Sequence, residues 1–325
     1  MIVKARTIPL KLLILAAILR RLPLTHHKYQ AILGEFKRRE AGYHGEVSLD
    51  YYLRSLPQEK YLILHDLNLP DGGYNCQIDT LLLTPEFGLI IDVKNMIGKL
   101  IFDTENEQFI QINNDKEKGY PDPIAQAERH KAFIKKWLAA NGFHPVPIDY
   151  MVVIGNPYAT YVLSGPNARK VKPRVCKADA FLSKIQFFEN LYSTSLLNPK
   201  ELRKICRLLV KMNTPPTKFL LEKFGIKQSD LLTGILGPCC NYLPLIRKKQ
   251  KWYCPRCDNY FVDAHIAALL DYFLLFDMKI TNRQFREFCH LDSIHTAKRL
   301  LMLSGKVNYS GIKKGRCYFP KVFPW

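Results

Sequence analysis

The sequence predicts an α/β (α+β) protein in which a mixed β-sheet is flanked by helices, followed by a smaller C-terminal module of different character. Apolar strand patterns at 74–84, 87–94 and 148–154 alternate with a long helical pattern at 123–140. A Thr-Pro-Pro break at 214–216 then ends this part of the chain. Clustered cysteines, short helices and a basic hairpin follow, and they predict a second folding unit.

The elements of the first 213 residues each follow from a local signal. Pro70-Asp71-Gly72-Gly73 and Pro85-Glu86 are turn signals, and Asp122 followed by Pro123 is typical of a helix start. In chain order we expect an N-terminal helix, a helix ending near Leu56, strands at 61–65, 74–84, 87–94 and 99–102, a helix at 123–140, a strand at 148–154, and helices at 177–185 and 198–211.

The N-terminal apolar run is interpreted as an amphipathic helix. It is short and is interrupted by Lys11, whereas a membrane-spanning helix needs about 20 apolar residues. A helix docked on the protein is preferred, and weak membrane-surface contact is the alternative because Arg20 and Arg21 follow the run. The expected regions are this helix and a linker at 1–35, the α/β domain at 36–213, a linker at 214–236, a cysteine knuckle at 237–262, and a helix-and-hairpin domain at 263–325.

The composition favours a polyanionic partner. Lys and Arg number 48 against 29 Asp and Glu, a net charge of +19, and the excess is denser after residue 241. Nucleic acid is the first expected partner and an anionic membrane the second, and a merely basic protein is the alternative. Nine Cys in 325 residues do not make a disulfide scaffold, so a reducing cytoplasm is expected. The oligomeric state is not indicated.

Charged residues interrupt the strand at 87–94, which is otherwise apolar. Side chains alternate along a strand, so Asp92 and Lys94 share one face while Ile91 and Val93 share the other. Burying an Asp and a Lys is costly unless they pair or bind a metal. A tight return at residues 85–86 brings Asp79 of the preceding strand beside Asp92. Two adjacent carboxylates repel each other, and a hard divalent cation is the usual reason to tolerate them.

Two helices carry polar residues on apolar faces. Glu46 has helical spacing with Leu49, Leu53 and Leu56, so its carboxylate is expected to face the core. In the helix at 123–140, Gln126 and His130 have the same spacing with Phe133 and Trp137. A polar group that faces a core needs a partner, which predicts that both helices contribute to one polar site.

These residues together resemble the PD-(D/E)xK nuclease superfamily and, within it, the NERD (nuclease-related domain) family. The resemblance covers roughly residues 40–155 and rests on order, spacing and residue type. It is carried by Gly45-Glu46, by IDTLLLTPEFGLIIDVKN at 78–95, and by PDPIAQAERH at 121–130. One departure is the second acid, which is usually Glu in the family pattern and is Asp92 here.

The resemblance implies a restriction-endonuclease-like fold and Mg²⁺- or Mn²⁺-dependent cleavage of nucleic acid. Asp79 and Asp92 would bind the metal, and Glu46 would support it directly or through water. Lys94 would position the attacking water or stabilise charge on the phosphate, and Gln126 would orient the site. The leading hypothesis is therefore a DNA nuclease. The alternative is a catalytically silent nucleic-acid-binding protein that keeps this fold, and a buried Asp–Lys ion pair without catalysis is the plainest reading of the strand.

A cysteine cluster follows the linker. Cys254-Pro-Arg-Cys257 is a CxxC knuckle, and Cys239 and Cys240 lie upstream of it. The pattern resembles a zinc ribbon, in which four ligands hold a structural Zn²⁺. The first knuckle is imperfect, because Gly237 stands where the first Cys is expected and two adjacent Cys make strained joint ligands. His265 is a further candidate ligand, and a degenerate ribbon without metal is the alternative.

The last 63 residues resemble a winged helix-turn-helix. Asp263, Thr281 and Ser293 are expected to cap three helices, with Ile294, Ala297, Leu300 and Leu301 of the third facing inward. A basic hairpin spans 307–319. In that arrangement the third helix enters the DNA major groove and hairpin cations meet phosphates. The predicted DNA-binding residues are His295, Thr296, Lys298, Arg299, Lys313, Lys314 and Arg316. A small helical domain for protein contact is the alternative.

Overall fold

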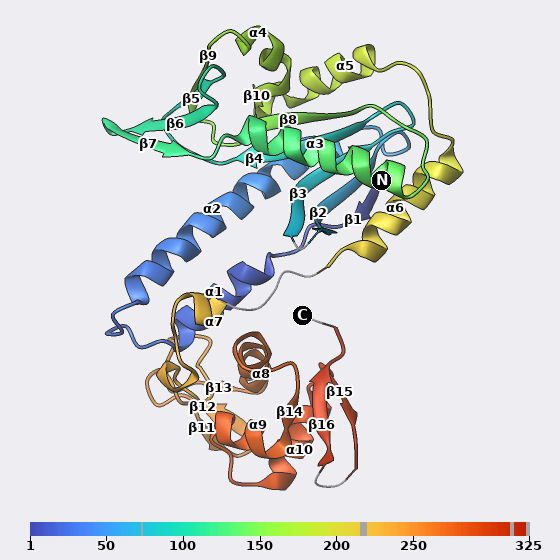
Figure 1. Cartoon of the computed structure of the whole chain (residues 1–325). Helices are drawn as coiled ribbons and strands as arrows, with labels where there is room; N and C mark the ends of the chain where they lie inside the picture. The colour runs from blue at the N-terminus through green and yellow to red at the C-terminus, as the bar shows by residue number, and fades with distance from the viewer. Residues whose placement is uncertain (73, 215–219, 313–314, 323–325) are drawn as a thin grey trace. The chain divides into compact units, whose positions relative to one another are not determined.

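The chain divides into two compact units. Unit 1 comprises residues 1–8 and 39–216, and unit 2 comprises residues 9–38 and 217–325. The N-terminal residues, expected as one separate region, are thus shared between the units. The structure is a computed structural model, and it describes residues 1–72, 74–214, 220–312 and 315–322 (Figure 1).

A six-stranded mixed sheet forms the centre of unit 1. Its strand order is β1-β2-β3-β4-β8-β10, in which β2, β3 and β4 are antiparallel neighbours and the other neighbours run parallel. The strands β4 and β8 are apolar along almost their whole length because both faces of the sheet are covered. The strand bounds are β1 Ile2–Lys4, β2 Leu62–Asp71, β3 Tyr74–Leu83, β4 Gly88–Lys94, β8 Ile148–Ile154 and β10 Val175–Lys177.

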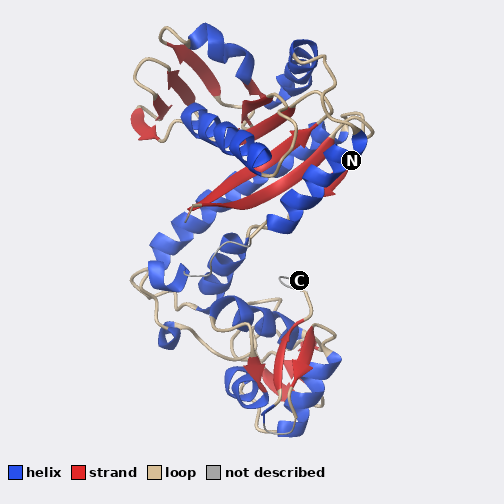
Figure 2. Ribbon diagram, turned by 45° about the vertical axis from the view of Figure 1, so that its right-hand side comes forward, coloured by secondary structure: helices blue, strands red, loops and turns tan. Residues whose placement is uncertain are grey.

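Helices lie on both faces of this sheet (Figure 2). On one face α3 and α6 pack into a core together with the second sheet, whose order is β7-β6-β5-β9. On the other face α2 and α5 pack against residues such as Leu82, Leu89 and Ile91. The bounds are α2 Tyr29–Arg54, β5 Lys99–Asp103, β6 Gln108–Asn113, β7 Lys116–Tyr120, α3 Pro123–Ala140, β9 Thr160–Ser164, α4 Ala168–Val171, α5 Phe181–Leu191 and α6 Pro199–Met212.

The pairing of β2 with β3 is interrupted at one position. His65 pairs with Thr80 and Leu67 pairs with Ile78, but the residues between them, Asp66 and Asp79, form no ladder pair. Asp66 has a backbone φ of 52°, in the left-handed region that non-glycine residues rarely adopt. The irregularity also resets the alternation of side chains, as a bulge does. This local break lies beside the residues that the sequence singled out.

The N-terminal helix is docked within unit 2. Helix α1, Leu10–Arg21, packs against α8, Ala264–Leu275, and its buried residues include Leu15 and Ile18. Its last residue, Arg21, is fully buried and donates from Nε to Asp271 Oδ2 at 2.8 Å. In the structure, helix α1 is therefore packed within unit 2. Among the described residues, no helix has the length and apolar character needed to cross a membrane.

The rest of unit 2 consists of two small three-stranded sheets and short helices. In the first sheet β12 lies between β11 and β13, and in the second β16 lies between β14 and β15. The capping box expected at Thr281 and the cap at Ser293 are present, whereas Asp263 makes no side-chain capping hydrogen bond. The bounds are α7 Leu220–Lys223, β11 Ile246–Lys248, β12 Lys251–Tyr253, β13 Tyr260–Phe261, β14 Ile280–Thr281, α9 Asn282–Cys289, α10 Ile294–Leu303, β15 Val307–Ser310 and β16 Cys317–Pro320.

Candidate active site and cysteine cluster

The strand register brings the predicted acids together. Thr80 of β3 pairs with Ile91 of β4 at the end of that ladder, and Asp79 and Asp92 are the next residues on the two strands. Asp92 is buried, and the Nζ of Lys94 lies 2.7 Å from its Oδ2. Both β4 side chains point to the face that α3 covers, because Ile90, two residues earlier, belongs to that core. Asp92 and Lys94 are thus in contact, and the charge of Asp92 acts on Asp79.

Helix α3 extends the polar site. Its start is set by Asp122, whose side chain accepts from the backbone N–H groups of Ile124 and Ala125. One turn later Gln126 Oε1 accepts from Lys94 Nζ at 3.4 Å. His130 lies half-buried in the following turn, and burial lowers its pKa while the Asp92 charge acts against that shift. The helix predicted at 123–140 thus places Gln126 against the lysine.

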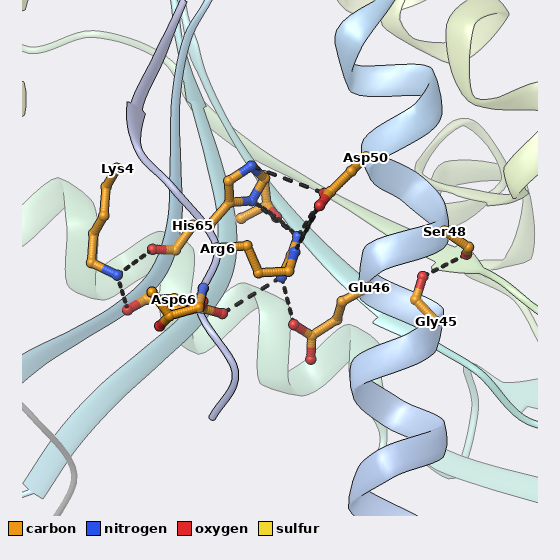
Figure 3. A network of polar contacts seen from close by, with 10 residues as sticks. Lys4, Arg6, Gly45, Glu46, Ser48, Asp50, His65 and Asp66 are labelled. Carbon is orange, nitrogen blue, oxygen red and sulfur yellow. Dashed lines mark hydrogen bonds and ion pairs between the residues drawn. The ribbon is translucent and has the colours of Figure 1, made fainter. Parts of the chain in front are cut away.

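Glu46 reaches the site from α2, on the opposite face of the sheet. Gly45 allows this approach, since a Cβ at that position would overlap the side chain of Asn95, directly after β4. The amide of Asn95 donates to Ala41 O at 2.7 Å and ties the helix there. The carboxylate of Glu46 does not point freely into the site. Its Oε2 accepts from Arg6 Nη1 at 2.5 Å (Figure 3).

The acids raise one another's pKa values. Burial, and then the charges of Asp92 and Glu46, raise the pKa of Asp79 well above its usual range. Burial raises the pKa of Glu46 to about 7, with Arg6 opposing the shift and Asp66 and Asp92 adding to it. Burial alone would lower the pKa of Lys94, but Asp92 outweighs it and the pKa is raised. The site therefore concentrates negative charge, and the nearby cations offset only part of it.

The donor set fits a hard divalent cation. Carboxylate oxygens are the ligands that Mg²⁺ and Mn²⁺ prefer, and mutual repulsion of the acids is relieved by a bound cation. Asp92 Oδ2 is buried and lies 2.7 Å from the Lys94 ammonium. Asp79 and Asp92 would hold the ion. Glu46 is turned toward Arg6, so its carboxylate is held less closely to those of Asp79 and Asp92.

The cysteine cluster is a separate site in unit 2. Among the residues that the structure describes, only Cys240, Cys254 and Cys257 form a group of three or more His, Cys, Asp or Glu whose ligand atoms all lie within 4.8 Å of one another. Cys240 and Cys254 have their sulfurs 3.4 Å apart. Cys239 is exposed and hydrogen-bonds to Cys257. His265 is buried beside Trp252 and is not part of this group.

The predicted DNA-binding residues of α10 lie on its exposed side. His295, Lys298 and Arg299 are exposed, and Thr296 is partly buried. Ile294 was expected to face inward but is 59% exposed, because it is the first helical residue and precedes the packed turn at Ala297. Arg316 stacks on the ring of Tyr309, 4.5 Å from its centroid. Lys313 and Lys314 lie outside the described residues.

Sequence reasoning missed the residues around Glu46. Arg6, Asp50, His65 and Asp66 all join its network, and they come from the N-terminal segment, α2 and β2 (Figure 3). Asp50 lies one helical turn after Glu46, which is the one local signal that an analysis of spacing could have used. Arg6 follows a three-residue strand and no pattern marks it.

Replacing Asp79 with Asn is expected to stabilise unit 1 without metal. A raised folded-state pKa means that ionised Asp79 disfavours folding, an effect absent below the unfolded pKa near about 4 and growing as pH rises toward the folded value. In EDTA, Asp79→Asn should raise the melting temperature at pH 8, and the gain should shrink toward pH 4. Asp103→Asn, which removes a partly exposed acid with a lowered pKa, should not stabilise. A lower melting temperature for Asp79→Asn at pH 8 would contradict this account.

Comparison with known proteins bears on the same part of the chain. Residues 41–155 match the family model described as the nuclease-related domain. No curated protein and no solved structure matches the chain. The matched range begins in α2 just before Glu46 and ends just after β8, so it contains Asp79, Asp92, Lys94 and Gln126. Residues 41–155, within unit 1, are therefore similar to the nuclease-related domain (NERD) family.

Proposed function

We propose that the protein is a metal-dependent nuclease that hydrolyses phosphodiester bonds of DNA. The observation that carries the proposal is the buried Asp92–Lys94 contact directly opposite Asp79, within a nuclease-related domain. A nuclease-related domain implies nucleic acid as substrate or partner. Burial, and then repulsion from Asp92 and Glu46, raise the pKa of Asp79, and a cation at this position would offset these effects.

The chain's own residues have distinct roles in this proposal. A bound Mg²⁺ or Mn²⁺ supplies Lewis-acid polarisation of the scissile phosphate and a more acidic water. Asp79 and Asp92 hold that ion, and Glu46 supports it. Lys94, fixed between Asp92 and Gln126, donates to the phosphate oxygen on which charge develops. Gln126 keeps the ammonium aimed at that position.

The second candidate is a nucleic-acid-binding protein without turnover. It would keep the fold and the ion pair but lack metal-dependent cleavage. The cluster of buried acids favours the enzyme, because a binder of polyanions gains nothing from negative charge held in its sheet. Cleavage itself separates the two.

The cleavage test uses plasmid and linear duplex DNA with Mg²⁺, Mn²⁺ or EDTA. The wild type should cut in either metal and not in EDTA. Lys94→Met should lower the rate about 100-fold or more, since it removes a donor to the developing charge. The double variant Asp92→Ala, Lys94→Ala removes both buried charges and leaves neither unpaired.

The matched control for cleavage is Lys136→Met, which removes an exposed lysine from the same helix that carries Gln126. It should cut like the wild type. Cleavage by the double variant at the wild-type rate would remove the assignment of the site.

We further propose that the cysteine group holds a structural Zn²⁺. Thiolate ligands at tetrahedral spacing are typical of such sites, and Cys240, Cys254 and Cys257 already converge. Burial alone would raise the pKa of Cys257, but hydrogen bonds from Cys254 and Asn259 lower it to about 7. A thiol of lowered pKa is readily deprotonated for metal binding. Cys239 is the adjacent fourth thiol.

Protein purified without added zinc should contain about one Zn²⁺ per chain by elemental analysis. Cys254→Ser and Cys257→Ser should lose most of it, because each removes one of the three converging ligands. Cys317→Ser, in the same unit but outside the group, should retain it. Wild-type protein free of zinc would favour a degenerate knuckle.

We also propose that unit 2 is a DNA-binding module related to winged helices. The element order α8-β14-α9-α10-β15-β16, with β16 between the other two strands, supports this. The knuckle adds cations on the same unit. Burial, and then the charge of Arg299, lower the pKa of Arg247 in this unit. Such clustering of like charge is typical of a surface that binds phosphates.

Charge reversal on α10 tests this module. Lys298→Glu with Arg299→Glu should weaken DNA binding and make the slope of log Kobs against log salt less steep by about 2, since each phosphate contact contributes about 0.9. Lys200→Glu with Lys211→Glu, two exposed positions on α6 of unit 1, is the matched control with the same change in net charge. An unchanged slope in the α10 variant would count against the module.

A further inference from the structure

The N-terminal segment, residues 1–8, lies outside the matched domain yet belongs to the same compact unit. Strand β1 adds to the edge of the sheet beside β2. Two residues after β1, the side chain of Arg6 turns inward and is only 4% exposed. A buried guanidinium needs partners for its five N–H donors.

Arg6 finds those partners on three different elements (Figure 3). Nη1 donates to Glu46 Oε2 at 2.5 Å and lies 3.5 Å from Asp66 Oδ1. Nε and Nη2 both donate to Asp50, at 3.2 to 3.3 Å. Nη2 also lies 3.0 Å from Thr80 Oγ1 and 2.9 Å from His65 Nδ1. One side chain thus ties α2 to both strands of the β2–β3 pair.

The segment also holds the break in the ladder opposite Asp79. Lys4 Nζ donates to the carbonyl oxygens of His65 and Asp66 at 2.7 and 3.0 Å. The backbone N–H of Thr7 donates to Asp66 Oδ2 at 3.0 Å. Asp66 has the left-handed backbone and lies across from Asp79, with which it forms no ladder pair. A strained residue persists only where its surroundings fix it, and here the segment supplies those contacts.

We infer that Arg6 is a positioning residue of the nuclease site: it holds Glu46 as the outer support of the metal and fixes the strand break that presents Asp79. The inference rests on the proposed nuclease function. Arg6 engages Oε2 of Glu46, which would support the ion from this fixed position. The Arg6 guanidinium is buried and its donors are engaged, so it holds the carboxylates of Glu46, Asp50 and Asp66 in fixed positions. The matched domain alone, without residues 1–8, lacks the Arg6 side chain that makes these contacts.

The test compares Arg6→Met and Arg6→Lys with the wild type in the full-length protein. The Mg²⁺ concentration for half-maximal cleavage is measured at saturating DNA, and Mn²⁺ binding is measured by electron paramagnetic resonance without DNA. Loss of an outer support is expected to raise both metal constants about tenfold or more for Arg6→Met. Arg6→Lys keeps the charge but not the fork, so its values should fall between.

Arg174→Met is the matched control. It removes another arginine from unit 1, one that bonds to Asp149 at the far end of β8. It should lower thermal stability but leave both metal constants at wild-type values. This separates positioning from a general loss of stability, which both arginine variants share.

Each outcome decides the inference. Unchanged metal constants in a folded Arg6→Met would overturn it, and tighter metal binding would show instead that Arg6 competes with the ion. If Arg6→Met does not fold, Asp50→Asn loosens the guanidinium while leaving Arg6 and Glu46 in place, and it should shift the constants in the same direction; unmoved constants would again overturn the inference. Wild-type protein that neither cleaves nor binds Mn²⁺ would remove the nuclease proposal as well, whereas an active wild type with unmoved variants would remove this inference alone.

Discussion

Repulsion between carboxylates held on neighbouring buried strands is the constraint around which unit 1 is organised. The antiparallel register of β3 and β4 sets Asp79 opposite Asp92, and a third acid, Glu46, arrives from α2. The low dielectric of a covered sheet strengthens that repulsion. Two cations offset this repulsion from opposite faces of the sheet. Lys94 lies on the face of α3, and Arg6 lies on the face of α2.

The two faces of the sheet contribute to the site in different ways. On one face the contacts come from β4 and α3, whereas on the other face they depend on the N-terminal segment. Lys94 contacts Asp92 within its own strand and Gln126 one helix away, so this half of the site is set by local geometry. The other half depends on an eight-residue segment at the start of the chain, whose Arg6 joins α2, β2 and β3. Loss of that segment would leave several acids without their cation. The break in the ladder at Asp66 gives Asp79 an irregular backbone neighbour on β2.

Unit 2 also contains buried charges, but there they form a structural ion pair. The ion pair between Arg21 and Asp271 is fully buried, and Arg21 also donates to the carbonyl oxygens of Leu232 and Gly234. The Arg21 guanidinium also lies over the ring of Phe288, and Arg20 Nη2 lies 2.6 Å from Oδ1 of the same carboxylate, which suits a structural role. The acids around Asp79 outnumber the cations that contact them, whereas at Asp271 two arginines meet one acid. That difference in balance distinguishes a site suited to a cation from a structural contact.

The sequence by itself determined the strands, the helix at 123–140 and the half of the site that spacing encodes. Alternation set Asp92 and Lys94 on one face, and the short return at 85–86 set the register of Asp79, since both depend on neighbours in the chain. Only the tertiary structure decided that Arg6 pairs with Glu46, that Asp66 breaks the ladder, and that Cys240 rather than Cys239 joins Cys254 and Cys257. Those contacts join residues far apart in the sequence or depend on backbone direction, and no local period records either.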